Sequence, residues 1–353
     1  MTHDLPNTDS APIPPRYVRQ SQFAALGTEG QARILQSTAL VVGCGALGSV
    51  IANTLARAGV GTVRIVDRDF LEWNNLQRQV LYDEQDVRNG LPKAIAAANR
   101  LRQINSLVTI EPHVADVSSQ NIHTLAEGVQ VIVDGTDNFE TRFLMNDYSL
   151  RFHVPWVFGG CIGAEGQTMT VIPDRSACLR CLIPEVPPPG TSPTCDTAGI
   201  LAPIINVIAS IQACEALKIL SGNVDAVHPG MYVFDLWENR VRQIKVDSLR
   251  ASGGCPACSG QQFPWLDGTR TSQSAILCGR NAVQLSFPQR GRVSLEQMAE
   301  KLSSLGKVQT NPFLLRFYVD NITITLFADG RAIVSGTDDV AQARSLYARY
   351  IGN

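Results

Sequence analysis

The sequence predicts an α/β fold, with a Rossmann-like, mostly parallel sheet, helices on both faces, a structural zinc site and a small C-terminal α+β module. Three observations support this prediction. Short β-rich apolar runs alternate with helical patterns over most of the chain. A glycine-rich turn, GCGALG at residues 43–48, follows the first such run. Residues from about 275 onward carry a separate hydrophobic pattern.

The hydrophobic periodicity places each element in order. A helical pattern from Tyr17 to Leu35 breaks near Gly27, and the first βαβ unit follows it. This unit has a strand at 40–42, a helix from about Ala46 to Gly59 and a strand at 62–66. The further expected elements are a helix at 90–105, a strand at 109–114, a buried strand and loop at 129–138, a helix to about 150, glycine-broken strands at 155–173, a buried helix at 200–222 and a hairpin at 231–246.

Composition shifts divide the chain into three parts. A polar, Pro-rich tail at residues 1–15 is expected to be disordered, and the main domain is expected to span 16–262. The C-terminal module is expected at 275–353, with ADG at 328–330 as a turn signal. Its expected elements are strands at 282–287, 313–319 and 322–327 and helices at 295–305 and 340–350.

Composition and charge restrict the class of protein. The chain has 353 residues, is 44% hydrophobic and 18% charged, and carries a net charge of −2. This balance gives no electrostatic reason to expect a nucleic-acid partner, and no apolar run reaches the roughly 18–20 residues that a membrane helix needs. Nine cysteines, four of them in CxxC pairs, indicate a reducing compartment and metal binding, and hence a cytoplasmic protein. The five histidines form no metal or triad spacing.

The glycine turn predicts a nucleotide site. A turn of this kind places backbone N–H groups and a helix N-terminus against phosphate, and Asp67, ending the second strand, can bind ribose hydroxyls. These features fit NAD, FAD or ATP equally. Asn75, Arg78 and Lys93 follow closely, and such side chains favour a site that cleaves a triphosphate, because negative charge builds on the transferring and leaving phosphates.

Two aspartates follow the strand expected at 129–138. Asp137 lies on a loop at the strand end, where a carboxylate can hold Mg²⁺. Asp134 is expected to be structural or to help at the strand end, and Asp69 to shape the loop after Asp67.

The cysteines fall into three groups. Cys178 with Cys181 and Cys255 with Cys258 form two CxxC pairs, which predict a closed, structural zinc site with four thiolate ligands; two unrelated redox pairs are the alternative. Cys195 lies outside both pairs, beside the Pro-rich stretch at 187–194 and before an apolar helix, where a thiol pKa can be lowered. The remaining cysteines are expected to pack as small hydrophobic residues: Cys44, Cys161, Cys214 and Cys278.

A series of motifs occurs in order over about residues 16–260: RYxRQ at 16–20, GxGxxG, DxD, NLQRQ at 75–79, GxPKA, TDNxxTR, CxxC, TCxxAGxxAP at 194–203 and a second CxxC. This series resembles the ThiF/MoeB/HesA family, the bacterial relatives of ubiquitin-activating enzymes. The resemblance implies ATP rather than NAD. It also implies adenylation of the C-terminal glycine carboxylate of a small ubiquitin-like sulfur carrier protein, such as ThiS or MoaD.

The resemblance also implies roles for individual residues. Gly43, Gly45 and Gly48 would shape the phosphate turn, with Ala46 at a position where the family commonly has glycine. Asp67 would bind the ribose, and the phosphates would be bound by Asn75, Arg78 and Lys93. Asp137 would bind Mg²⁺, and Cys195 would form a covalent link to the carrier. Arg19 would contact the γ-phosphate of the ATP that the neighbouring protomer binds. The role of Arg19 implies a homodimer, and a sulfur donor protein is a further possible partner.

Several alternatives stay open at this stage. The substrate could be another ubiquitin-like protein or a peptide, and the thiazole branch is favoured over the molybdopterin branch. An NAD-dependent oxidoreductase and a non-catalytic scaffold are the alternatives from other classes. The C-terminal module is too short for a sulfur-transferring rhodanese domain. It could instead recruit the carrier or a sulfur donor, or extend the dimer.

Overall fold

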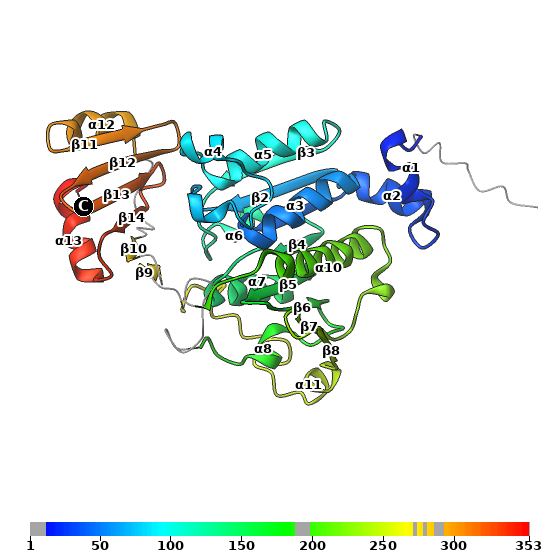
Figure 1. Cartoon of the computed structure of the whole chain (residues 1–353). Helices are drawn as coiled ribbons and strands as arrows, with labels where there is room; N and C mark the ends of the chain where they lie inside the picture. The colour runs from blue at the N-terminus through cyan, green and yellow to red at the C-terminus, as the bar shows by residue number, and fades with distance from the viewer. Residues whose placement is uncertain (1–11, 188–197, 271–273, 278–280, 286–292, 353) are drawn as a thin grey trace, which may run out of the picture.

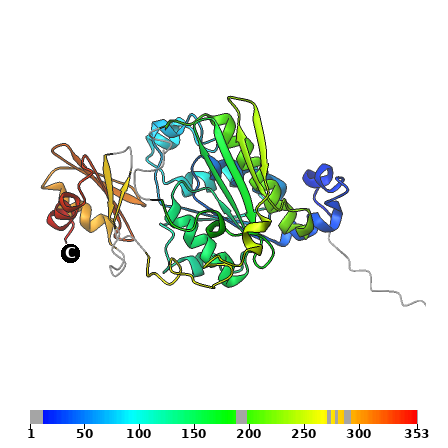
Figure 2. The ribbon, with the colours of Figure 1, turned by 90° about the horizontal axis from the view of Figure 1, so that it is seen from below.

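The computed structural model describes residues 12–187, 198–270, 274–277, 281–285 and 293–352. These residues form two units, a larger one around an eight-stranded sheet and a smaller C-terminal one around a six-stranded sheet (Figure 1). The N-terminal helices lie at one end of the molecule and the C-terminal module lies at the other, as both ribbon views show (Figures 1 and 2).

The large sheet has the order β3-β2-β1-β4-β5-β6-β7-β8. Its first five strands pair in parallel, whereas β6, β7 and β8 join antiparallel. The predicted fold class is confirmed. The strand bounds are β1 Thr38–Val42, β2 Thr62–Asp67, β3 Thr109–Val114, β4 Val131–Asp134, β5 Trp156–Ile162, β6 Glu165–Val171, β7 Met231–Asp235 and β8 Arg240–Ile244.

Helices cover both faces of this sheet because its central strands are apolar on both sides. Ala39 and Val41 of β1 join one buried cluster with three helices, α3 Ala46–Ala58, α5 Lys93–Ile104 and α10 Ala202–Leu220. Leu40 and Val42 point to the other face and pack in a second cluster with α7, Phe139–Phe152. This two-sided burial is typical of parallel strands in doubly wound folds.

Helix α10 is unusually apolar along its whole length. Among the described residues it is the one helix with the length and mean hydropathy of a membrane span, and half of it is buried within the fold. It packs in the same apolar cluster as α3 and the central strands. A buried core helix of a globular domain has these same properties, so its composition is weak evidence for a membrane.

Two helix ends lie where the sequence predicts them. Gly59 ends α3 with a φ of +84°, and a Cβ there would come within 2.5 Å of the buried Tyr17 ring, so both conformation and space require glycine. Asn105 caps α5, as predicted. The shorter helices are η1 Pro15–Tyr17, α1 Val18–Ser21, α2 Gly27–Gln36, η2 Trp73–Asn75, α4 Glu84–Arg88, α6 Ile122–Leu125, α8 Leu179–Leu182, η3 Val224–Ala226 and α11 Asp247–Ala251.

The C-terminal module has more strands than the sequence predicts. Its antiparallel sheet has the order β11-β12-β13-β14-β10-β9, with α12 Leu295–Ser303 and α13 Val340–Tyr350. Both helices and the three predicted strands are confirmed, whereas β9, β11 and β14 were not expected. The strand bounds are β9 Ser274–Leu277, β10 Ala282–Leu285, β11 Lys307–Thr310, β12 Leu314–Val319, β13 Ile322–Phe327 and β14 Ala332–Ser335.

Two boundaries bear on the predicted domain division. Residues 1–11 lie outside the described chain, and Pro15 already begins η1. Beyond the predicted end of the main domain at 262, Trp265 packs against Phe143 of α7 with ring centroids 4.5 Å apart. The main unit therefore continues at least to this tryptophan.

Candidate nucleotide-binding site and cysteine cluster

The glycine turn between β1 and α3 is shaped by close backbone contacts. Gly43 has a φ of +82°, and a Cβ there would lie 2.8 Å from the carbonyl oxygen of Gly135, at the end of β4. A Cβ on Gly48 would lie 1.8 Å from the carbonyl oxygen of Gly43. These two glycines therefore allow the turn to form and bring it against the loop after β4.

Gly45 is different, because the space around it is open. The nearest atom to a Cβ at Gly45 would be the side-chain nitrogen of Gln79, at 3.8 Å. Gly45 is the N-cap of α3, and Ala46 is the first residue of that helix. A helix N-terminus with free N–H groups beside open space fits a phosphate group.

Asp67, at the end of β2, is tied to this turn. Its carboxylate is almost buried, with 7% exposure, and accepts hydrogen bonds from the backbone N–H of Cys44 at 2.6 Å and of Asp69 at 2.7 Å. Burial raises the pKa of Asp67, and the positive charge of Lys93 opposes the rise. Each carboxylate oxygen keeps lone pairs that could accept ribose hydroxyl groups.

Lys93 brings a buried positive charge to the same edge of the sheet. It begins α5 and is 4% exposed, and its Nζ lies 3.0 Å from Asp69 Oδ2. The backbone N–H of Lys93 also donates to the carbonyl oxygen of Asp69 at 2.9 Å. Asp69 therefore positions Lys93 while Asp67 positions the glycine turn. The sequence predicted that Asp69 shapes the loop.

The segment that carries Asn75 and Arg78 packs on the turn through residues that the sequence reading did not single out. The hydroxyl of Tyr82 donates to the carbonyl oxygen of Cys44 at 2.6 Å. Gln79 is buried, and its Oε1 has no hydrogen-bond partner among the described residues. A buried amide oxygen without a partner is a candidate acceptor for a ligand donor group, and the Nε2 of the same side chain lies nearest to the position of a Cβ at Gly45. The NLQRQ motif, which ends at Gln79, carried the available signal.

Asn75 and Arg78 hold local contacts in this structure. Asn75 is buried and its Oδ1 accepts the backbone N–H of Glu72 at 3.1 Å. The guanidinium of the half-buried Arg78 donates to the carbonyl oxygen of Asn74 at 2.6 Å. Their assignment to the phosphates stays a prediction.

The two aspartates after β4 have different surroundings. Asp134 is fully buried, and its Oδ2 accepts a hydrogen bond from Nε of Arg142 at 3.0 Å, which fits the expected structural role. Asp137 is exposed on the loop. Burial alone would lower the pKa of Arg68, but the negative charges of Asp116, of Asp69 and, after them, of Asp137 raise it.

These loops meet where the strand order reverses. β1 lies between β2 and β4, so the glycine turn, Asp67 and the Asp137 loop follow the carboxyl ends of three neighbouring parallel strands. Ligands of open α/β sheets bind at such a reversal. The structure therefore brings together the turn, Asp67, Lys93 and the loop of Asp137.

Arg19 is not brought to this site by its own chain. It lies exposed in α1, and the next residue, Gln20, donates to the carbonyl oxygen of Ala58 at the C-terminal end of α3. The glycine turn is at the opposite end of α3, about 18 Å away for a helix of this length. A role for Arg19 at the site would therefore require a second subunit.

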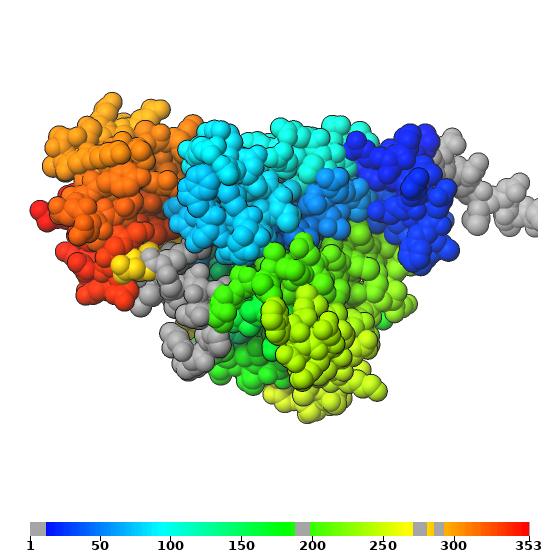
Figure 3. All heavy atoms as spheres, in the orientation of Figure 1, coloured from blue at the N-terminus to red at the C-terminus, as the bar shows by residue number. Residues whose placement is uncertain are grey.

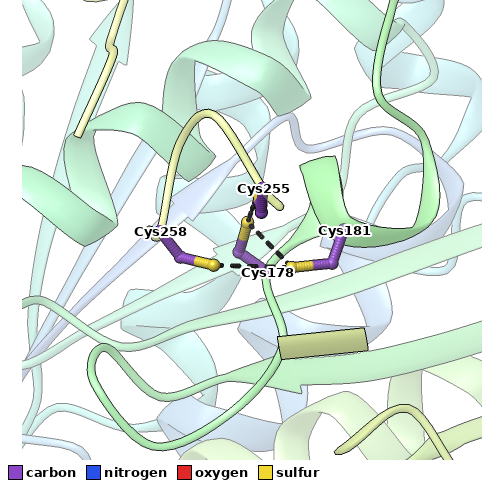
Figure 4. A group of neighbouring side chains, drawn as sticks. All are labelled: Cys178, Cys181, Cys255 and Cys258. Atoms are coloured by element: carbon purple, nitrogen blue, oxygen red, sulfur yellow. Dashed lines mark hydrogen bonds between the residues drawn. The ribbon is translucent and has the colours of Figure 1, made fainter. Parts of the chain in front are cut away.

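The four CxxC cysteines converge, although the two pairs are far apart in the sequence (Figure 4). Their sulfur atoms all lie within 4.8 Å of one another, with separations of 3.8 Å for Cys178–Cys181, 3.6 Å for Cys178–Cys255 and 3.5 Å for Cys181–Cys258. A tetrahedron of zinc–sulfur bonds of about 2.3 Å has edges of about 3.8 Å. The donor set and spacing therefore fit a zinc ion.

The other cysteines divide differently from the prediction. Cys44 is buried, and burial raises the pKa of its thiol to about 12, so it packs as a neutral small residue as expected. Cys214 is exposed on α10, so the prediction that it is packed is wrong: its position on the helix faces away from the buried cluster. Cys161 is half-buried, and Cys195 and Cys278 lie outside the described residues.

The fold, the glycine turn at the strand reversal and the cysteine cluster together are those of an α/β protein with a candidate nucleotide site and a four-cysteine cluster. Comparison with known proteins makes the class specific. The model of the ThiF family matches residues 17–257, and the chain belongs to the ThiF family.

The chain is also similar in sequence to curated proteins of this family. The chain is 43% identical over 338 residues to the sulfur carrier protein ThiS adenylyltransferase of Bacillus subtilis, covering 96% of this chain and 99% of that protein. It is 40% identical over 243 residues to the SAMP-activating enzyme E1 of Haloferax volcanii, covering 69% of this chain and 88% of that protein. Among solved structures, E. coli MccB with ATP aligns with a TM-score of 0.58 and 22% identity, over 70% of this chain and 74% of that one, which supports the fold alone.

Proposed function

We propose that this chain uses ATP to adenylate the C-terminal glycine carboxylate of a ubiquitin-like sulfur carrier protein, with release of pyrophosphate, and so prepares the carrier to receive sulfur. The observation that carries this proposal is the near full-length similarity to the ThiS adenylyltransferase of Bacillus subtilis. It favours a ThiS-like carrier, whereas the similarity to a SAMP-activating enzyme keeps another ubiquitin-like substrate as the second candidate.

The pocket residues fit this chemistry. The α3 N-terminus at Gly45 and Ala46 would hold phosphate oxygens, Asp67 would hold the ribose, and Lys93 would neutralise charge on the phosphates. A carboxylate oxygen of the carrier attacks the α-phosphorus, and the bond from that phosphorus to the bridging oxygen breaks, with its electrons leaving on pyrophosphate. The carboxylate is already ionised at neutral pH, so the reaction needs no general base, and catalysis rests on alignment and charge neutralisation.

Two metals belong to the proposal. Asp137, exposed at the strand reversal, would hold a Mg²⁺ ion, which would neutralise charge on the triphosphate. The four cysteines would hold zinc in a closed site without an open position for substrate, so zinc would stabilise the fold rather than take part in the reaction.

The partners follow from the same arrangement. We propose a homodimer in which Arg19 of one protomer reaches the phosphates bound by the other, because a single chain keeps this arginine at the far end of α3. A covalent link through Cys195, a separate sulfur donor protein and a cytoplasmic location are part of the same proposal. An oxidoreductase is disfavoured by the family membership.

The test is carrier-dependent exchange of labelled pyrophosphate into ATP, using candidate carriers that end in Gly-Gly. We expect Lys93→Ala or Arg78→Ala to lower the exchange rate about 30- to 1,000-fold, which corresponds to about 2–4 kcal/mol of transition-state stabilisation. Lys301→Ala, at an exposed lysine of α12, is the control and should exchange at the wild-type rate. Wild-type rates in both pocket variants would refute the phosphate role, and absence of exchange with every such carrier would refute the function.

A further inference from the structure

The C-terminal module contacts the larger unit beside the nucleotide-binding segments. Figure 3 shows the orange module against the cyan part of the larger unit. The interface has an apolar part, in which Phe70 and Val114 pack on a buried cluster of the module that consists of Ala282, Leu314, Phe327 and Ile333. Phe70 lies three residues after Asp67, so this contact adjoins the candidate nucleotide site.

A buried arginine of the module holds the backbone that follows Asp67. Arg331 is 3% exposed, and its two terminal nitrogens donate to the carbonyl oxygen of Arg68 at 3.1 and 3.2 Å. The guanidinium also stacks on the Phe327 ring at 4.1 Å and approaches Asp329 at 3.4 Å, so its position is fixed within the module. Two N–H groups of one charged guanidinium thus donate to the same carbonyl oxygen, and hydrogen bonds from a charged donor are strong and directional.

A second contact reaches the side chain of the same residue, Arg68. Gln284 of β10 is 2% exposed and donates through Nε2 to Asp116 Oδ2 at 2.6 Å. That carboxylate in turn accepts hydrogen bonds from Arg68 Nη1 at 3.2 and 3.3 Å. The module therefore fixes both the backbone and the guanidinium of the residue between Asp67 and Asp69.

A third contact reaches the segment that leads into Lys93. Asn311 donates through Nδ2 to the carbonyl oxygen of Gly90 at 3.2 Å, and Arg316 lies over the Phe70 ring at 4.2 Å. A β-bridge between Phe70 and Pro92 ties this segment to the one after Asp67. Both pocket-forming segments, 68–70 and 90–92, are therefore held from outside by one module.

We propose that the C-terminal module is a brace for ATP binding, in which Arg331 is a positioning residue that fixes Asp67 and Lys93 through the segments at 68–70 and 90–92. The proposal rests on the proposed nucleotide role of that pocket. The module lies beyond residues 17–257, which the family model matches, so it supplies none of the family's own motifs. Its proposed effect is on the orientation of the segments that carry Asp67 and Lys93.

The test compares full-length variants by their affinity for ATP. Arg331→Met removes the guanidinium and keeps the apolar stem, and Arg344→Met, at an exposed arginine of α13 in the same module, is the matched control. Titration calorimetry with ATP in the absence of carrier should give a dissociation constant that is about 3- to 30-fold higher for Arg331→Met and unchanged for Arg344→Met. In pyrophosphate exchange, KM for ATP should rise by the same factor, with kcat within about twofold of wild type.

A milder variant covers the case in which Arg331→Met does not fold. Asn311→Asp keeps the oxygen that accepts the backbone N–H groups of Phe313 and Leu314 and removes the donor to Gly90. It should raise the dissociation constant for ATP in the same direction by a smaller factor. Unchanged ATP affinity in a folded Arg331→Met or in Asn311→Asp, or a loss confined to kcat, would overturn the brace. Pyrophosphate exchange by the wild-type protein tests the proposed function, whereas the ATP affinity of the variants tests the brace. The two proposals can therefore fail separately.

Discussion

The three glycines of the turn between β1 and α3 have different physical tasks. Gly48 has no room for a Cβ, because the carbonyl oxygen of Gly43 lies 1.8 Å from the position that the Cβ would take. Gly45 has room, and the nearest atom to a Cβ would be 3.8 Å away. Gly48, like Gly43 with its positive φ, is needed for the turn to form, whereas Gly45 keeps space clear for the ligand.

This difference predicts opposite outcomes for the same substitution. Gly48→Ala should destabilise the protein by about 3 kcal/mol or more, because backbone must move to admit the methyl group. Gly45→Ala should change the free energy of unfolding by less than about 1 kcal/mol and should weaken ATP binding roughly tenfold or more. Denaturant unfolding and ATP titration of both variants measure the two effects. Equal stability losses, or full ATP affinity in Gly45→Ala, would contradict this division of tasks.

The sequence predicts the site residues that belong to a motif. It does not predict the residues that reach the glycine turn only through tertiary contacts. The turn glycines, Asp67 and Lys93 follow from spacing after predicted strands. Tyr82 and Gln79 reach the turn only because the chain at 73–82 folds back over it, and periodicity does not report such a contact. Arg19 shows the other limit, since its place at the far end of α3 depends on packing between distant segments.

At the scale of elements, the cysteine cluster joins two short segments that have little regular structure. Cys178 is the N-cap of the four-residue helix α8, and Cys255 and Cys258 lie in a turn closed by backbone bonds to the Cys255 carbonyl oxygen. A metal bound by such segments stabilises the folded state directly, because the unfolded chain lacks the assembled site.

We therefore expect Cys255→Ser to abolish stoichiometric zinc binding and to lower the thermal unfolding midpoint by several degrees or more. Cys214→Ser, at an exposed thiol outside the cluster, should leave both zinc content and midpoint unchanged. Metal analysis of the purified proteins and thermal unfolding test the prediction. A wild-type protein without zinc, or a Cys255→Ser variant that keeps it, would rule out the zinc site.

The elements that the sequence predicted are those with strong apolar periodicity. The central strands and α3, α5 and α10 form around buried clusters and match their expected positions. Strand β11 has a largely exposed, polar sequence, KVQT, and forms at the sheet edge by pairing with β12. Strand β14 contains only four residues and depends on pairing with β13 and β10. Such strands depend on tertiary pairing more than on their own sequence.

At the scale of the whole molecule, one chain assembles most of the predicted pocket. The glycine turn, Asp67, Lys93 and the Asp137 loop meet at the strand reversal, with the C-terminal module packed next to them. Helix α1, which carries Arg19, lies at the opposite end of the molecule from that module (Figure 1). The candidate nucleotide-site residues therefore come from one chain, whereas the proposed role of Arg19 requires a second subunit.

The central claim is that the pocket joins AMP to a protein carboxylate and splits ATP between its α- and β-phosphorus atoms. Mass spectrometry of a Gly-Gly-ended carrier, after incubation with the wild-type enzyme, ATP and Mg²⁺, tests this claim most directly. We expect one added adenylate on the C-terminal glycine, with an equal amount of pyrophosphate released. An unmodified carrier with ADP and inorganic phosphate as products would contradict the account.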